Sequence, residues 1–138
     1  MCLGDSKNVL VELPLFNYPI YVTEVLFDMN QRGYRPIIAH PERYIAAQKD
    51  MDRFLEDIAD YADFQINTGS LSGMYGSKAK KTAKELIKRD RVTYIASDAH
   101  DHKAYGTLAK AYDIFQRLKG KEEADKVFFY NPLLVSNV

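Results

Sequence analysis

The sequence Ile-Ile-Ala-His-Pro-Glu-Arg-Tyr at residues 37–44 decides how the chain is interpreted, together with Tyr-Ile-Ala-Ser-Asp-Ala-His at residues 94–100. In each, an apolar run typical of a buried strand ends in side chains that bind metals. Such strands carry chemistry at their carboxyl ends in α/β sheets. We therefore expect His40, Asp98 and His100 to meet at one rim, where nitrogen and oxygen ligands suit a divalent cation.

The composition is that of a globular domain without a polyanion-binding surface. The chain has 138 residues, is 46% hydrophobic and 28% charged, and carries no formal net charge. This balance argues against a general nucleic-acid binder. Its one cysteine, Cys2, allows no intramolecular disulfide. With neither a secretory signal nor an apolar run long enough to span a bilayer, we expect a cytoplasmic protein without membrane insertion.

Strand patterns alternate with helical patterns along the chain. We expect strands at Asn8–Leu13, Arg35–Ala39, Phe64–Asn67 and Val92–Ala96. We expect the main helices at residues 19–32, after a cap at Asp50, at 77–89 with Ser77 as cap, and at 107–119, with a Gly/Ser-rich loop at 68–77. The alternation predicts one α/β domain over residues 1–138, with parallel strands joined by right-handed crossovers. Four such strands are about half of a barrel.

Arg43 is the candidate phosphate ligand. Pro41 fixes the exit from the preceding strand, so that Arg43 reaches the same rim as His40. There its guanidinium can hold a phosphate through two parallel hydrogen bonds. The alternative is a surface ion pair with Glu42 or Asp50.

Asp98 and His100 form a D-x-H pair at a strand end, which points both side chains to the same side. A carboxylate after the apolar run 94–96 is unfavourable to bury without a counter-charge, and a metal supplies one. The alternative is an Asx turn or helix cap at Asp98 with a solvated His100. His102 lies in the following loop and is a candidate for substrate or metal contact.

Glu12 interrupts the apolar strand at residues 9–13. A carboxylate inside a buried strand needs a cation or an arginine beside it, which makes Glu12 a further candidate metal ligand. The alternative is that this strand shows one face to water. Cys2 is excluded as a phosphatase nucleophile, because the C-x5-R pattern fails at Asn8.

Four short strings together resemble one enzyme family. They are V-E-L-P at 11–14, A-H-P-E-R-Y at 39–44, N-T-G-S-L at 67–71 and S-D-A-H at 97–100. They resemble the bacterial manganese-dependent protein-tyrosine phosphatases of the polymerase and histidinol phosphatase (PHP) superfamily. The resemblance runs from Asn8 to the C-terminus.

The resemblance implies a distorted (β/α)7 barrel, related to the TIM barrel, with a metal centre that usually holds manganese and tolerates iron or zinc. Glu12, His40, Asp98 and His100 match family metal ligands, and Arg43 matches an arginine near the substrate phosphate. Arg43, His40 and Asp98 would then be catalytic, with Arg43 and His102 contacting substrate. The implied substrate is phosphotyrosine on the tail of a tyrosine kinase that governs capsule or exopolysaccharide export.

The chain departs from the family pattern at two places. The family's H-x-H strand and further ligands upstream are missing, since eleven residues precede Glu12. The usual arginine after the D-x-H pair is also missing, because residues 101–111 hold only Lys103 and Lys110 as basic side chains apart from His102. We therefore expect the C-terminal part of a barrel, weakly active or inactive alone, whose unpaired edge at Asn8–Leu13 favours self-association.

Two other functions remain open. The chain could be a non-catalytic remnant that binds a kinase tail without hydrolysis. It could also belong to a PHP hydrolase for a small phosphomonoester such as histidinol phosphate.

Overall fold

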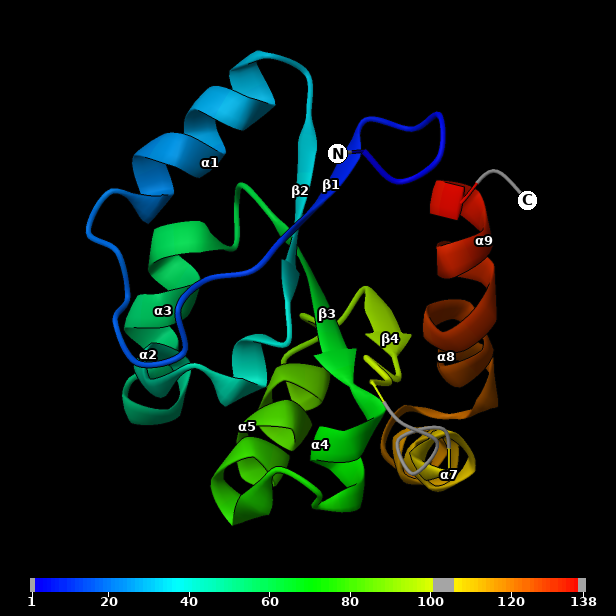
Figure 1. Cartoon of the computed structure of the whole chain (residues 1–138). Coiled ribbons are helices and arrows are strands. Elements are labelled where there is room, and N and C mark those ends of the chain that lie inside the picture. Colours follow the sequence, from blue (N-terminus) through cyan, green and yellow to red (C-terminus); the bar gives the residue numbers. More distant parts are fainter. Residues whose placement is uncertain (1, 101–105, 137–138) are drawn as a thin grey trace.

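The computed structural model describes residues 2–100 and 106–136, and these form alternating strands and helices (Figure 1). The strands are β1 (Asn8–Val11), β2 (Arg35–Ala39), β3 (Asp63–Asn67) and β4 (Tyr94–Ala96). The helices between the strands are α1 (Val22–Gln31), η1 (Pro41–Arg43), α2 (Ile45–Lys49), α3 (Met51–Ile58), α4 (Thr68–Ser72) and α5 (Gly76–Lys88). The helices after β4 are α7 (Thr107–Lys119), α8 (Lys121–Asp125), η2 (Lys126–Tyr130) and α9 (Asn131–Ser136).

The strands form one parallel sheet in the order β1-β2-β3-β4. This confirms the predicted α/β class with helical crossovers between parallel neighbours. Figure 1 shows α1, α2 and α3 on one side of the strands and α8 and α9 on the other. Because neighbouring strands run the same way, their carboxyl ends share one edge of the sheet. The candidate residues that follow the strands are thereby brought to that edge.

The core lies between the sheet and the helices that join its strands. Phe54 of α3 is its aromatic centre, with ring centroids 5.8 Å from Tyr18, 6.4 Å from Tyr44 and 6.0 Å from Phe64. The predicted cap of this helix is confirmed, because Asp50 Oδ1 accepts a hydrogen bond from the Arg53 N–H at 3.1 Å. The capped helix buries its apolar face against β3.

Residues 68–77 are not the predicted loop. Residues 68–72 form α4, whose first four residues are buried, and tertiary packing there overrides the low helix propensity of glycine and serine. Gly73 ends this helix with a left-handed φ of 93°. Helix α5 then begins at Gly76, after Tyr75, so the predicted cap at Ser77 is wrong.

The first strand is shorter and more exposed than predicted. It ends at Val11, and Leu10 keeps 49% of its surface accessible, because β1 is the first strand in the sheet order. On its outer side the structure shows a single antiparallel bridge, between Cys2 and Val9. In the described part of the chain the strands form an open sheet, and closure into a barrel stays a prediction.

Large apolar side chains are exposed in two groups. One group lies on α1 and the segment before it, and the other on η2 and α9. They are Phe16, Ile20, Tyr21, Val25 and Phe27 in the first group, and Phe129, Tyr130, Leu133 and Leu134 in the second. Exposed apolar surface of this extent is typical of surfaces that become covered by other protein. Over the described ranges, no helix combines the length and hydropathy that crossing a bilayer requires.

We predict that the 138-residue chain self-associates through the open edge of the sheet at β1 and that Leu10→Lys, a substitution on this strand, weakens the association. A lysine on an edge strand opposes edge-to-edge pairing because it must be buried on contact. Sedimentation velocity over a range of concentrations should show species heavier than a monomer, shifted toward monomer by the substitution. Glu56→Gln makes the same change of net charge on the exposed face of α3 and should leave the distribution unchanged. A wild-type chain that is monomeric at every concentration contradicts the prediction.

Candidate functional site

Polar side chains gather at the rim formed by the carboxyl ends of the strands. Glu12 directly follows β1, His40 directly follows β2, Asn67 ends β3, and Asp98 lies two residues after β4. The parallel sheet thus places three of the predicted metal-binding residues at one rim, although they are up to 86 residues apart in the sequence (98 − 12). Asn67 was not predicted as a site residue.

His40 and Glu12 form a close pair at this rim. The Nε2 atom of His40 lies 3.2 Å from Glu12 Oε1, and the His40 backbone N–H donates to Gln65 O at 2.7 Å. Burial lowers the pKa of His40, aided by Arg43 and opposed by the carboxylates of Glu12 and Asp98. The imidazole is therefore neutral at neutral pH, which is the form that binds metals.

Glu12 itself is not buried inside a strand as predicted. It lies beyond the end of β1, and 68% of its side chain is exposed. The structure therefore agrees with the alternative that this segment meets water, yet the Glu12 carboxylate still reaches His40. The buried partner of the pair is the imidazole, whose Nδ1 atom is shielded from solvent without a hydrogen-bond partner.

Tyr44 joins the ends of β1 and β2 and so sets the distance between Glu12 and His40. Its hydroxyl donates to Ala39 O at 2.7 Å and accepts from the Leu13 N–H at 2.9 Å. Burial raises the pKa of Tyr44, so the phenol stays protonated and keeps its donor. The two bonded backbone groups directly neighbour His40 and Glu12.

Asp98 lies beside two partners, Asn67 at the end of β3 and Arg43 of η1. Asn67 Nδ2 donates to Asp98 Oδ2 at 2.9 Å, and Arg43 Nη1 lies 3.8 Å from the same oxygen. His100 is 88% exposed, with its Nδ1 atom 2.9 Å from Asp98 O and 3.9 Å from Asp98 Oδ1. His100 is thus solvated in this structure, which agrees with the alternative interpretation of the D-x-H pair given above. Asp98 itself faces the rim.

Backbone strain marks the same two positions. In the described part of the chain, the non-glycine residues with positive φ are His40 at 37°, Asp90 at 57° and Asp98 at 49°. Left-handed backbone is uncommon for side-chain-bearing residues and often occurs at functional sites. His40 and Asp98 adopt it where their strands end, which turns both toward the rim.

Glu42 is a buried residue of the site region that the sequence pattern did not single out. It is fully buried, and its Oε1 atom accepts from the Asn67 N–H at 2.9 Å and from Ser70 Oγ at 2.6 Å. Burial raises the pKa of Glu42 to about 7, although these hydrogen bonds and Arg43 oppose the shift. Glu42 therefore joins η1 to the end of β3 and the start of α4.

Arg43 consequently has other neighbours than those considered from the sequence. A surface ion pair with Glu42 is wrong because Glu42 is not at the surface, and Asp50 is the cap of α3. Arg43 instead lies near Asp98 and over the ring of Tyr75, with its guanidinium carbon 4.3 Å from the ring centroid. The guanidinium reaches the rim, where it could meet an oxyanion.

The donors at the rim fit a divalent cation in kind but do not complete a site. Imidazole and carboxylate groups suit manganese, iron and zinc, and the neutral His40 can offer a lone pair. Across residues 2–100 and 106–136, however, no three His, Cys, Asp or Glu side chains lie close enough to share an ion. The donors stand as two pairs, His40 with Glu12 and Asp98 with His100. The predicted contact residue His102 lies outside the described residues.

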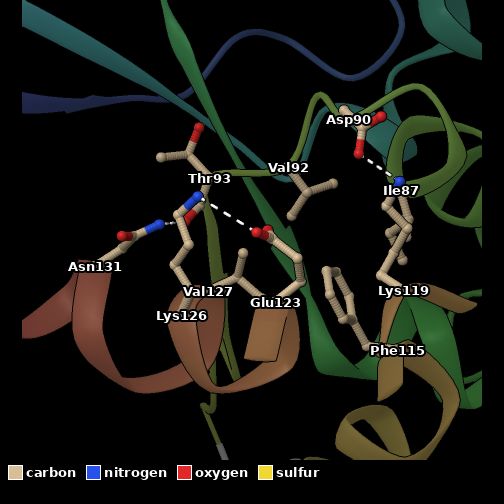
Figure 2. A pocket seen from close by; sticks show the side chains of 10 residues that line it. All are labelled: Ile87, Asp90, Val92, Thr93, Phe115, Lys119, Glu123, Lys126, Val127 and Asn131. Atoms are coloured by element: carbon tan, nitrogen blue, oxygen red, sulfur yellow. Dashed lines mark hydrogen bonds and ion pairs between the residues drawn. The ribbon is translucent and has the colours of Figure 1, made fainter. Parts of the chain in front are cut away.

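A pocket of about 330 Å³ lies away from this rim, beside Thr93 at the amino end of β4 (Figure 2). Asn131 closes one side of it by donating to Thr93 O at 2.8 Å. The charged side chains that line it pair with one another, Lys119 with Asp90 and Lys126 with Glu123. Because these charges are paired, the pocket offers no excess positive charge for a phosphate.

Comparison with known proteins places the chain among capsule-synthesis proteins. The family described as "Capsular polysaccharide synthesis, CpsB/CapC" matches residues 1–136. The tyrosine-protein phosphatase YwqE of Bacillus subtilis (strain 168) is 33% identical over 103 residues, which are 75% of this chain and 41% of YwqE. The putative tyrosine-protein phosphatase CapC of Staphylococcus aureus is 32% identical over 133 residues, which are 96% of this chain and 52% of CapC.

A solved structure agrees with the sequence comparison. It comes from work on YwqE of Bacillus subtilis and CpsB of Streptococcus pneumoniae, described as unique metal-dependent tyrosine phosphatases. This chain matches it with a TM-score of 0.88 and 28% identity, over 96% of this chain and 54% of the other. The chain spans about half the length of the curated relatives it matches.

We predict that Tyr44→Phe lowers the free energy of unfolding by about 2 kcal/mol, because two backbone groups beside the buried hydroxyl lose their partner. Urea denaturation measures the change. Tyr130→Phe removes a hydroxyl from a tyrosine that is 63% exposed and should change stability little. Equal stability of the two variants would show that the Tyr44 bridge does not hold the strand ends together.

We also predict that Glu42→Leu destabilises the fold by about 2–3 kcal/mol, because it leaves the Asn67 N–H and the Ser70 hydroxyl buried without an acceptor. Glu42→Gln keeps one acceptor oxygen and should lose less than half as much. The same denaturation experiment on Glu56→Leu, an exposed position of α3, controls for the loss of a carboxylate. A Leu variant as stable as the Gln variant contradicts this role for Glu42.

Proposed function

Because this chain belongs to the CpsB/CapC family of capsular polysaccharide synthesis proteins, we propose that it carries part of the active site of a metal-dependent tyrosine-protein phosphatase. The relatives YwqE, CapC and CpsB are named as tyrosine-protein phosphatases, CapC putatively. The sequence similarity and the TM-score of 0.88 support a common fold and a common site.

The observation that carries the proposal is the meeting of two kinds of group at one rim. The neutral His40 and the carboxylates of Glu12 and Asp98 can be ligands of a cation. Arg43, beside Asp98, can donate hydrogen bonds to an oxyanion. A cation next to a guanidinium is the arrangement that neutralises a phosphoryl group during its transfer. Neither group alone would favour phosphate chemistry over a structural ion pair.

Glu12, His40, Asp98 and His100 would hold the metal, and manganese is the ion we propose, with iron and zinc as alternatives. When bound, the metal would supply Lewis acidity and an activated water near neutral pH. Asn67 would hold Asp98 in place through its amide, at 2.9 Å. Arg43 would bind a non-bridging phosphoryl oxygen, and His102 would contact substrate.

The proposed substrate is phosphotyrosine in a protein, namely the tail of a tyrosine kinase of capsule or exopolysaccharide synthesis. The names of the relatives and of the family support this choice. We propose the cytoplasm as the location, where a single cysteine is compatible with a reducing environment.

The short length bears on how much activity to expect. We propose that the chain corresponds to the C-terminal part of a PHP-type barrel, since it spans about half of its relatives and its donors stand in pairs. Further ligands would then come from the rest of such a barrel. We therefore expect weak metal binding and slow hydrolysis from the 138-residue chain.

One observation favours a second candidate function. Because the described residues bring no three metal-binding side chains together, the chain could bind a phosphotyrosine tail through Arg43 without hydrolysing it. A phosphatase for a small phosphomonoester such as histidinol phosphate is distinguished from both by its substrate.

We predict that the chain binds manganese when the ion is supplied and then releases phosphate slowly from a phosphotyrosine peptide, and that a chelator abolishes the release. Asp98→Ala should lower turnover about 100-fold, because it removes both a metal ligand and the partner of Arg43. Elemental mass spectrometry and phosphate release measure the two properties. Asp28→Ala, at an exposed ion pair of α1, is the matched control.

The outcomes separate the candidates. Manganese-dependent release that survives Asp98→Ala rules out the proposed site. Peptide binding without release supports the binding function, and faster release from histidinol phosphate than from the peptide supports the third candidate. A chain that neither binds nor hydrolyses the peptide contradicts the first two.

A further inference from the structure

The ring of Tyr75 stacks against the guanidinium of Arg43, the side chain to which we assign phosphate binding. The guanidinium carbon of Arg43 is 4.3 Å from the centroid of the Tyr75 ring, well within the range of a cation–π contact. Arg43 comes from η1, whereas Tyr75 comes from the turn between α4 and α5. The contact therefore joins two crossover connections at the rim of the sheet.

The Tyr75 ring can occupy this place because residue 69 is glycine. A Cβ atom on Gly69 would lie 2.7 Å from Tyr75 Cε2, closer than such atoms approach, and 3.3 Å from Tyr75 Cζ, which is a tight contact. The ring thus rests against the backbone of α4 on one side of the contact. Gly69 is required here by space and not by a left-handed backbone.

The backbone of the turn holds Tyr75 in register with Gly69. The Met74 N–H donates to Gly69 O at 2.8 Å, and the Gly76 N–H donates to Gly73 O at 3.2 Å. Gly73 and Gly76 have φ values of 93° and 90°, which favour glycine at both ends of the turn. These hydrogen bonds and backbone angles set the course of the turn that carries Tyr75.

The stacking also affects how Arg43 meets Asp98. Arg43 Nη1 lies 3.8 Å from Asp98 Oδ2, which is too long for a hydrogen bond. A free arginine would approach a nearby carboxylate to about 2.8 Å and form two parallel bonds. Held over the ring, the guanidinium feels the charge of Asp98 but does not give its N–H donors to it.

We propose that Tyr75 is a positioning residue, which holds the Arg43 guanidinium at the rim with its donors available to an oxyanion, and that Gly69 makes this position accessible. The inference rests on the proposed function, because it deepens the role given there to Arg43. It adds Tyr75 and Gly69 to the residues that determine phosphate binding, although neither touches the phosphate.

The first test reads the position of Arg43 without metal or substrate. In the metal-free chain, ring currents of Tyr75 shift the Arg43 side-chain N–H resonance in ¹H–¹⁵N NMR spectra. The shift should persist in Tyr75→Phe, which keeps the ring, and disappear in Tyr75→Leu and in Gly69→Ala. Tyr130→Leu makes the same change at an exposed tyrosine and should leave the resonance in place. An unchanged Arg43 resonance in folded Tyr75→Leu overturns the inference.

The second test measures the affinity of the manganese-loaded chain for inorganic phosphate by isothermal titration calorimetry. Tyr75→Leu should weaken binding about fivefold, because the arginine must then be immobilised when the anion binds. Tyr75→Phe should bind as the wild type does, and Gly69→Ala should add nothing to Tyr75→Leu in the double variant.

Arg43→Ala distinguishes the proposed role of Arg43 in phosphate binding from the positioning role of Tyr75. It should weaken phosphate binding about tenfold or more. If Arg43→Ala binds phosphate like the wild type, or the wild type binds none, the proposed role of Arg43 fails, and the positioning role of Tyr75 with it. If Arg43→Ala loses binding while Tyr75→Leu retains it, the positioning role alone fails.

Discussion

The site depends on one buried carboxyl group, that of Glu42. Its Oε1 atom accepts from the Asn67 N–H and from Ser70, which fixes η1 against the end of β3. The Asn67 amide in turn holds Asp98, and Asp98 lies beside Arg43, the next residue after Glu42. The contacts thus form a closed circuit from η1 through β3 and the segment after β4 back to η1. The buried Glu42 acceptor cannot shift without leaving the Asn67 N–H and the Ser70 hydroxyl unsatisfied, which favours the observed position of η1 against β3.

Each carboxylate at the rim has a polar partner in this structure. Glu12 faces His40, and Asp98 faces Asn67 and Arg43, so neither carboxylate stands alone. A metal bound by both Glu12 and His40 would have to replace the contact between these two side chains, because each would direct its ligating atom to the ion. The 68% exposure of the Glu12 side chain makes this rearrangement easy for Glu12, whereas buried His40 provides the fixed side of the pair.

Much of the fold was predictable from local pattern. The bounds of β2 and α7 agree with the predicted Arg35–Ala39 and Thr107–Lys119, and the cap at Asp50 is present, because apolar spacing and a capping side chain act within a few residues. The errors occur where distant packing decides. Residues 68–72 become helical because they are buried against other elements, and β1 is exposed because it lies at an end of the sheet order.

For the site, too, the local sequence pattern predicted some residues and only the fold revealed others. The sequence alone identified His40, Asp98 and Arg43 as rim residues, because each follows an apolar run and parallel strands end at one edge. It could not show that Glu42 is buried, that Asn67 holds Asp98, or that Tyr75 lies under Arg43. The pKa of a carboxyl and the place of a ring depend on neighbours that are distant in the sequence, such as Ser70 for Glu42 and Tyr75 for Arg43. Solvation and van der Waals contact are set by these long-range neighbours, so only the tertiary structure decides which polar residues of the rim are fixed and which remain free for chemistry.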